Sequence, residues 1–110
     1  MEIDPSQYPF RDVYKLLTGS LVPRAIAWVS TLSADGTANL APYSFFTAVC
    51  SNPPTVLFCP GIRGTDGGQK DSYNNVRATG EFVVNFVSEA TAEATNITAT
   101  ALPATADHTQ

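Results

Sequence analysis

The sequence has few charges, few basic residues and no long apolar run. Charged residues make up 15% of the 110-residue chain, and Lys plus Arg number 6 against 10 for Asp plus Glu, a net charge of −4. No Lys/Arg cluster is present, which argues against a nucleic-acid partner bound through its phosphates. No apolar stretch approaches the roughly 20 residues of a membrane span, and the start is acidic and broken by Pro5, unlike a signal peptide. We therefore expect a cytoplasmic protein with no membrane partner, forming a single domain over residues 1–110.

Groups for metal binding or hydrolytic catalysis are also scarce. Cys50 and Cys59 form no Cys/His set with zinc-ligand spacing, so no metal site is expected. They flank a proline-rich turn and could pair, but the lack of an export signal favours free, mostly buried thiols. The sole histidine, His108, lies in an Ala/Thr-rich tail, which argues against a catalytic Ser-His-Asp or Cys-His set. Asp66 and Asp71 could form an acid–base pair, although surface carboxylates in a polar loop are the simpler interpretation.

What the sequence does contain is a series of short strand patterns separated by turns. Runs rich in β-branched and aromatic residues predict five strands, over residues 25–32, 37–40, 43–49, 55–58 and 81–87. Gly36 can supply the positive φ of the first turn, and Pro42 predicts that pairing there lies at a sheet edge or is re-aimed. The order of the elements favours a mainly β fold, antiparallel, with flanking helices.

Three helices are predicted between and beside these strands. Apolar residues at spacings of three and four predict a helix over residues 8–17, which Thr18-Gly19 should end. Asp71 or Ser72 is expected to cap a helix over residues 72–78, closed by Gly80. Ser88 is expected to cap another over residues 89–98.

A glycine-rich segment, residues 60–69, precedes Lys70 and the predicted second helix. Gln69 stands where a Walker A loop needs glycine, and no GxGxxG motif follows a strand, so neither nucleotide motif is present. Glycine backbone amides, the positive end of a helix, the Lys70 cation and the Ser72 hydroxyl nevertheless suit one phosphate group. The alternative is a capped helix that simply follows a flexible loop.

Residues 39–46 combine polar, aromatic and small side chains around a proline. Such a break leaves backbone groups free to meet a ligand, and aromatic rings can line a flat apolar site. Composition alone favours the alternative, a core strand carrying two aromatic residues.

Together these segments resemble the flavin reductase-like, FMN-binding split-barrel family, over about residues 8–103. Each segment is a weak signal, whereas six in the same order are strong. The matching segments are residues 23–31, Asp35-Gly36, residues 39–46, residues 53–58, Lys70-Asp71-Ser72 with Asn75, and residues 79–85.

The resemblance implies a six-stranded antiparallel Greek-key split barrel that usually dimerises, with FMN near the dimer interface. Residues 39–46 would meet the flavin ring and ribityl chain, and Lys70 with Ser72 would hold the phosphate. Arg24 and Trp28 match the motif too, with ligand contact and packing both left open. The implied cofactor-binding residues are Ser30, Thr31, Asn39, Ala41, Pro42, Tyr43, Ser44, Phe45, Phe46, Lys70, Asp71 and Ser72.

The sequence departs from the family pattern at a few positions and in length. Ala25 replaces a common proline, Tyr43 a frequent phenylalanine and Ser72 a usual threonine, which keeps aromatic or hydroxyl character at the last two. Family members with this motif set are about twice as long. We therefore expect the chain to hold the N-terminal part of the domain and to lack the C-terminal barrel strands.

The function that the resemblance implies is that of a flavin reductase. An FMN-binding flavoprotein would pass reducing equivalents from NADH or NADPH to flavin or an acceptor, with the cofactor carrying the redox chemistry. No side chain is an evident general acid, so no catalytic residue is predicted. The alternatives are a non-catalytic FMN-binding or electron-transfer module and a truncated, inactive fragment.

Overall fold

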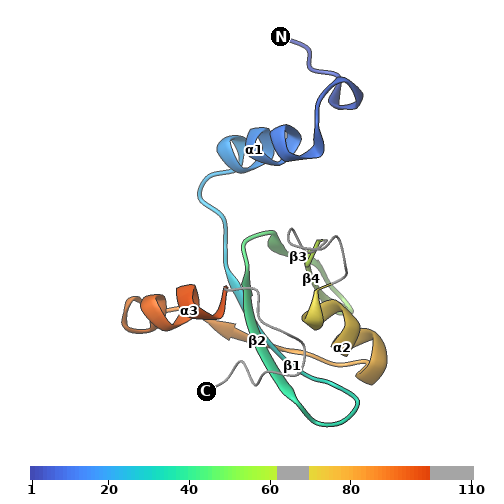
Figure 1. Cartoon of the computed structure of the whole chain (residues 1–110), viewed down its shortest axis with the longest axis vertical. Coiled ribbons are helices and arrows are strands. Elements are labelled where there is room, and N and C mark those ends of the chain that lie inside the picture. Colours follow the sequence, from blue (N-terminus) through green and yellow to red (C-terminus); the bar gives the residue numbers. More distant parts are fainter. Residues whose placement is uncertain (62–69, 100–110) are drawn as a thin grey trace.

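A computed structural model describes residues 1–61 and 70–99 of the chain. This part contains a three-stranded antiparallel sheet, a separate two-stranded hairpin and three α-helices (Figure 1), which confirms the predicted mainly β class with flanking helices. Within these residues the two sheets do not close into a barrel. The elements are α1 (Phe10–Ser20), β1 (Ala27–Leu32), β2 (Ala38–Tyr43), β3 (Phe46–Ser51), β4 (Pro54–Phe58), α2 (Asp71–Thr79), β5 (Val83–Phe86) and α3 (Ala92–Thr98), with 3₁₀ turns at Pro5–Gln7 and Glu89–Thr91.

The larger sheet has the strand order β2-β1-β5, with both neighbours antiparallel to β1. Val29 lies opposite Ala41 on one side and Val84 on the other. The turn between β1 and β2 contains Gly36 at a φ of +89°, as the sequence predicts. Pro42 lies within β2, which is an edge strand in the described residues and pairs only with β1. A proline, which has no N–H to donate, is tolerated in such a strand because no second neighbour needs that hydrogen bond.

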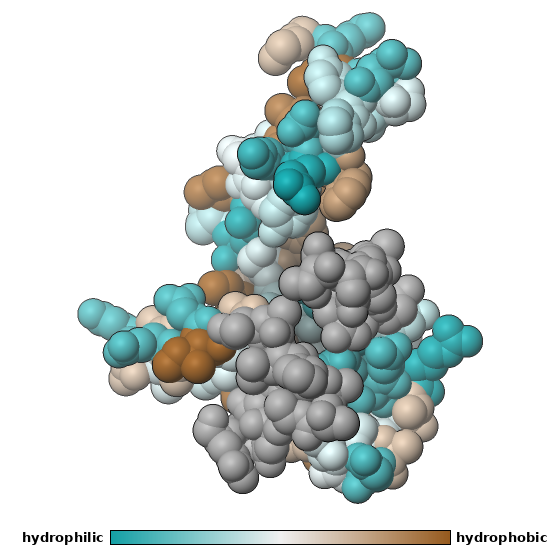
Figure 2. All heavy atoms as spheres, viewed as in Figure 1, coloured by the Kyte–Doolittle hydropathy of each residue, from teal (hydrophilic) through white to brown (hydrophobic). Residues whose placement is uncertain are grey.

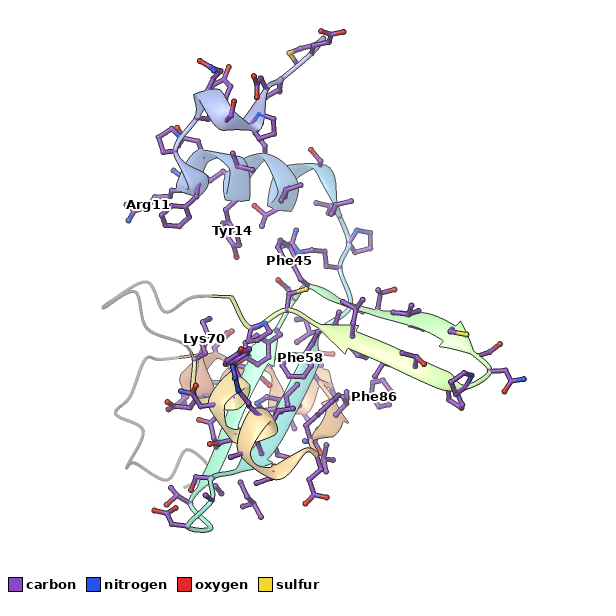
Figure 3. All side chains as sticks on the ribbon, turned by 90° about the vertical axis from the view of Figure 1, so that its right-hand side faces the viewer. Arg11, Tyr14, Phe45, Phe58, Lys70 and Phe86 are labelled. Atoms are coloured by element: carbon purple, nitrogen blue, oxygen red, sulfur yellow. The ribbon has the colours of Figure 1, made fainter. Side chains whose placement is uncertain are left out.

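The smaller sheet is the β3–β4 hairpin, which projects to one side of the molecule (Figure 3). Ser44 and Phe45 bend the chain between β2 and β3, so the strand expected over residues 43–49 begins only at Phe46. The expectation that Cys50 and Cys59 are buried is wrong, because both thiols are exposed, and both are free. Most residues of the hairpin are exposed, since it projects away from the larger sheet.

The first helix runs past the predicted stop at Thr18-Gly19 and ends at Ser20. The glycine does not end the helix because carbonyl groups at this end are bound by a side chain further along the sequence. Arg24 Nη1 donates hydrogen bonds to the carbonyl oxygens of Thr18 at 2.6 Å and Leu21 at 2.8 Å. Leu21 N–H closes the last turn by donating to the Leu17 carbonyl at 3.0 Å, and Arg24 supplies a partner for the next carbonyl, that of Thr18.

The start of α2 also differs from the prediction. Lys70 occupies the N-cap position and its side chain makes no capping hydrogen bond, so the N-cap residue is neither Asp71 nor Ser72. The reason lies in the tertiary structure, because the Ser72 hydroxyl accepts a hydrogen bond from Asn39 in the sheet. The glycine stop is confirmed by Gly80 at a φ of +77°. Ser88 stands before the 3₁₀ turn, where its N–H donates to Thr91 Oγ1 at 3.0 Å, and α3 itself begins only at Ala92, three residues later than predicted.

The buried core is small and lies on the α2 side of the larger sheet. Ala27, Val29 and Tyr43 are buried, and five partly buried residues pack against them. The helix α1 stands apart from this body (Figure 1), and apolar side chains cover part of its surface (Figure 2). Phe10, for example, is 83% exposed. No helix in the described part of the chain is long and apolar enough to cross a membrane. The residues packed on the core are Ala41, Phe46, Phe58, Phe82 and Val84.

Candidate flavin site

The larger sheet presents two chemically different faces, because successive residues of a strand point to opposite sides. Along β1, Ala27, Val29 and Thr31 are buried, whereas the residues between them are only half-buried. Thr31 lies directly opposite Asn39 of β2, so both side chains point to the same face. That face is the one covered by α2. Ser30, its neighbour in sequence, points to the other face.

A buried polar cluster joins the sheet to α2. Asn39 Nδ2 donates to Ser72 Oγ at 2.9 Å, and Asn75 Nδ2 donates to Thr31 Oγ1 at 3.0 Å. All four residues are at most 8% exposed. Burial of polar groups is tolerated because each of these side chains has a hydrogen-bond partner. We call these four residues the polar clamp.

Lys70 lies at the edge of the clamp, beside an aromatic group. Its Nζ is 5.5 Å from the centroid of the Tyr43 ring, within the range of a cation–π contact. The ring centroid of Phe58 is 5.1 Å from that of Tyr43. Phe82 continues the group, with its centroid 5.0 Å from that of Phe58. A cation therefore stands at the N-terminus of α2, next to an apolar aromatic surface.

The protonation state of Tyr43 follows from its burial. Loss of hydration raises the pKa of this phenol above its ordinary value of 10.0, the hydrogen bond with Ser72 lowers it, and the negative charge of Asp71 raises it. The net direction is upward, so the phenol is neutral near pH 7. A neutral phenol places no negative charge beside Lys70 and opposes no anion there.

The bend between β2 and β3 forms the other side of this region. Phe45 lies in the bend, with its ring 5.7 Å from the Arg24 guanidinium and 5.8 Å from the Tyr14 ring of α1. In Figure 3 Tyr14 points from α1 toward Phe45. Ser44 and Phe46 flank it and are half-buried. The bend therefore carries an aromatic ring, that of Phe45, which packs against Tyr14 of α1 and Arg24.

The opposite face of the sheet holds the remaining predicted residues. Asn85 of β5 donates through Nδ2 to the Trp28 carbonyl at 3.0 Å and to Ser30 Oγ at 3.4 Å. Pro42 lies opposite Trp28 in the register and shares this face. Trp28 Nε1 donates to Thr98 Oγ1 at 2.9 Å, which ties α3 to the sheet. For Trp28, the structure thus shows a packing and hydrogen-bonding role.

The structure therefore brings most of the predicted site residues to one side of the sheet and leaves two on the other. Ser30 and Pro42 are the two that lie apart, on the Trp28 face. Sequence reasoning assigned no role to Asn75, Phe58 or Phe82, although the spacing of three from Ser72 to Asn75 on one helix was a usable signal. Residues 62–69, with Asp66, and His108 lie outside the described residues. The residues on the α2 side or at its edge are Thr31, Asn39, Ala41, Tyr43, Ser44, Phe45, Phe46, Lys70, Asp71 and Ser72.

Comparison with known families supplies the context for this geometry. The sequence model of the flavin reductase like domain matches residues 19–110, a span that contains the polar clamp, Lys70 and the bend. The chain belongs to the flavin reductase like domain family. Membership implies a flavin cofactor.

Individual proteins are similar to this chain over most of its length. An uncharacterized protein of Deinococcus radiodurans is 50% identical over 101 residues, which cover 88% of this chain and 44% of that protein. The crystal structure of nitrilotriacetate monooxygenase component B from Bacillus cereus has a TM-score of 0.83 at 40% identity, and the match covers 94% of this chain and 50% of that one.

Two further structures extend the comparison. The 2-nitrobenzoate 2-nitroreductase NbaA of Pseudomonas fluorescens has a TM-score of 0.77 at 32% identity, covering 93% of this chain and 48% of that one. A split-barrel protein from Shewanella frigidimarina, with a TM-score of 0.71 at 19% identity, shares the fold and covers 98% of this chain and 53% of its own. The chain thus spans about half the length of the relatives that it matches.

Proposed function

We propose that this chain is the FMN-binding part of a flavin reductase, which takes reducing equivalents from NADH or NADPH. The observation that carries the proposal is the position of Lys70. It is the N-cap residue of α2, its side chain makes no capping hydrogen bond there, and it stands over the ring of Tyr43. A helix N-terminus and an ammonium group together suit the phosphate of FMN, which carries about two negative charges.

The flavin ring would lie against the aromatic surface beside this anion site. Half-buried Phe58 provides apolar area and packs on the ring of buried Tyr43, and the bend at Ser44 and Phe45 interrupts strand pairing next to them. The bend supports the role proposed for the main-chain N–H groups around residues 44–46, which is to bond the polar edge of the ring. On the β4 side, Phe46 is paired with Phe58 and the Phe45 carbonyl accepts from the Cys59 N–H. In this arrangement Ser30 and Pro42 lie on the opposite face of the sheet from the flavin, so a direct contact with this cofactor is not part of the proposal.

The chain's own residues bind and orient, and the chemistry belongs to the cofactor. A bound flavin accepts a hydride from a nicotinamide and passes electrons on. Similarity to a monooxygenase component and to a nitroreductase supports two acceptors, a partner oxygenase supplied with reduced flavin or a nitroaromatic compound reduced directly. The proposal includes a homodimer, because the family resemblance implies an FMN site near a dimer interface.

Flavin binding is tested by titrating the 110-residue chain with FMN and following fluorescence, together with size-exclusion chromatography. We expect Lys70→Ala to weaken FMN binding at least about tenfold, because one charge-assisted contact is lost. The matched control is Lys15→Ala, which removes the same charge from the exposed surface of α1. An unchanged affinity in Lys70→Ala would remove Lys70 from the phosphate site.

Two further outcomes decide the broader proposal. A folded chain, judged by circular dichroism, that gives no flavin signal in the titration would overturn FMN binding. Steady-state oxidation of NADH or NADPH with added FMN then tests the reductase activity. Bound FMN without nicotinamide oxidation would instead support a flavin-binding or electron-transfer module.

A further inference from the structure

The surface of α2 that faces the sheet is polar where an apolar surface would be the ordinary choice. Ser72 is fully buried and Asn75 is 8% exposed, and they face Thr31 and Asn39, each 5% exposed. Buried polar pairs contribute little net stability compared with apolar residues of the same shape, because each group must first lose its hydration. Their effect is greatest on geometry, since an unsatisfied amide or hydroxyl at this depth is costly.

The two hydrogen bonds of the clamp specify one position of α2 on the sheet. Thr31 and Asn39 are directly opposite each other on neighbouring strands, and Ser72 and Asn75 are three residues apart on one helix face. One amide donates from the sheet to the helix and the other from the helix to the sheet. A shift of α2 by one turn would leave an amide without its hydroxyl, so the pattern selects a single register.

The N-terminus of α2 is fixed through this register. Lys70 is two residues before Ser72 and five before Asn75, and its ammonium group lies 5.5 Å from the Tyr43 ring centroid. Asn74 N–H donates to the Lys70 carbonyl at 3.1 Å, so Lys70 belongs to the first turn of the hydrogen-bonded helix. Any tilt or slide of α2 would move the cation and the first-turn amides together.

We propose that the polar clamp is a positioning device that sets the phosphate selectivity of the flavin site through α2, with Asn75 and Thr31 as its key pair. This inference rests on the proposed flavin-binding function. The inference assigns a role to Asn75. In it, Thr31 and Asn39 affect the ligand indirectly, because their hydrogen bonds fix the position of α2. The aromatic surface depends less on this register, because the Phe58 and Phe82 rings come from β4 and the segment before β5. Tyr43 of β2 does contact α2, through its hydrogen bond with Ser72, a residue that the Thr31 and Asn75 variants leave in place.

The test compares FMN with riboflavin, which has the same ring and lacks the phosphate. We expect Asn75→Ala and Thr31→Val to weaken FMN binding about tenfold and riboflavin binding less than about twofold, since a displaced charge-assisted contact is worth at least a factor of ten. Asn74→Ala is the matched control, because Asn74 is the exposed neighbour of Asn75 on the same helix. Thr31→Ser, which keeps the hydroxyl, should restore the FMN to riboflavin affinity ratio to the wild-type value.

A double variant separates positioning from stability. Thr31→Val with Asn75→Leu replaces both partners by apolar groups of similar shape, which is close to neutral for stability. If the clamp positions the helix, this variant melts near the wild-type temperature and still has a reduced FMN to riboflavin ratio. A purely structural role predicts a wild-type ratio once stability is restored.

The outcomes distinguish this inference from the function on which it rests. Wild-type protein that binds neither flavin would overturn the proposed function, and the positioning role with it. Wild-type protein that prefers FMN, together with Thr31→Val and double variants that keep the same preference, would overturn the positioning role alone. Equal losses of FMN and riboflavin affinity would overturn it as well.

Discussion

Substitution of Arg24 by glutamine should loosen α1 without unfolding the sheet. Helices of this length are marginal alone, and Gly19 weakens α1 near its end. The Arg24 guanidinium donates two hydrogen bonds to carbonyls at that end and lies over the Phe45 ring. One of the two bonds is exposed, so we take a total of about 1–3 kcal/mol for these contacts.

Hydrogen exchange followed by mass spectrometry measures this loss locally. In Arg24→Gln, amides of α1 should exchange about 5- to 150-fold faster than in the wild type, the factor that corresponds to that free energy. Amides of β1 and β2 should keep their wild-type rates, because Arg24 makes its described contacts with α1 and Phe45. The matched control is Arg11→Gln, which removes the same charge from an exposed position of α1.

Two results would refute the reasoning. Exchange of α1 at the same rate in Arg24→Gln and Arg11→Gln would show that the guanidinium does not stabilise the helix end. Equal acceleration across α1 and the β1–β2 pair would show that Arg24 supports the whole fold and not the helix in particular.

Two further predictions concern Asp35 in the turn between β1 and β2 and the two glycines Gly36 and Gly19. Hydrogen bonds from Ser33 and then Thr37 hold the pKa of Asp35 below its ordinary value, so the carboxylate stabilises the fold above the unfolded pKa of about 4 and the effect is lost as pH falls through the lower folded pKa. The stability difference between wild type and Asp35→Asn should therefore shrink below about pH 4 in urea denaturation, and a constant difference down to pH 2 would contradict it. Gly36→Ala should destabilise the chain by about 1 kcal/mol because φ is +89°, whereas Gly19→Ala should stabilise α1 by about 0.5–1 kcal/mol. Melting curves that move in the same direction for both variants would count against this reading of the backbone.

Much of the fold was predictable from short-range patterns. The strands around Val29 and Val84, the turn at Gly36 and the glycine stop at Gly80 follow from rules that involve neighbouring residues only. The predicted site at Lys70 rested on the same kind of local signal, a glycine-rich segment followed by a cation and a helix. The exposure of Cys50 and Cys59 was not predictable in this way, because it depends on whether another element packs over the hairpin.

By itself, then, the sequence determined the element order, the family resemblance and the residues to consider for a flavin. Only the tertiary structure decided which of those residues share a face. Thr31 meets Asn75 across 44 positions and Asn39 meets Ser72 across 33, while adjacent Ser30 points the other way. The physical reason is that hydrogen bonds between a sheet and a packed helix depend on register and crossing geometry, which local periodicity does not encode. The end of α1 has the same explanation, since the Thr18 carbonyl near that end is bound by Arg24, which lies beyond the helix.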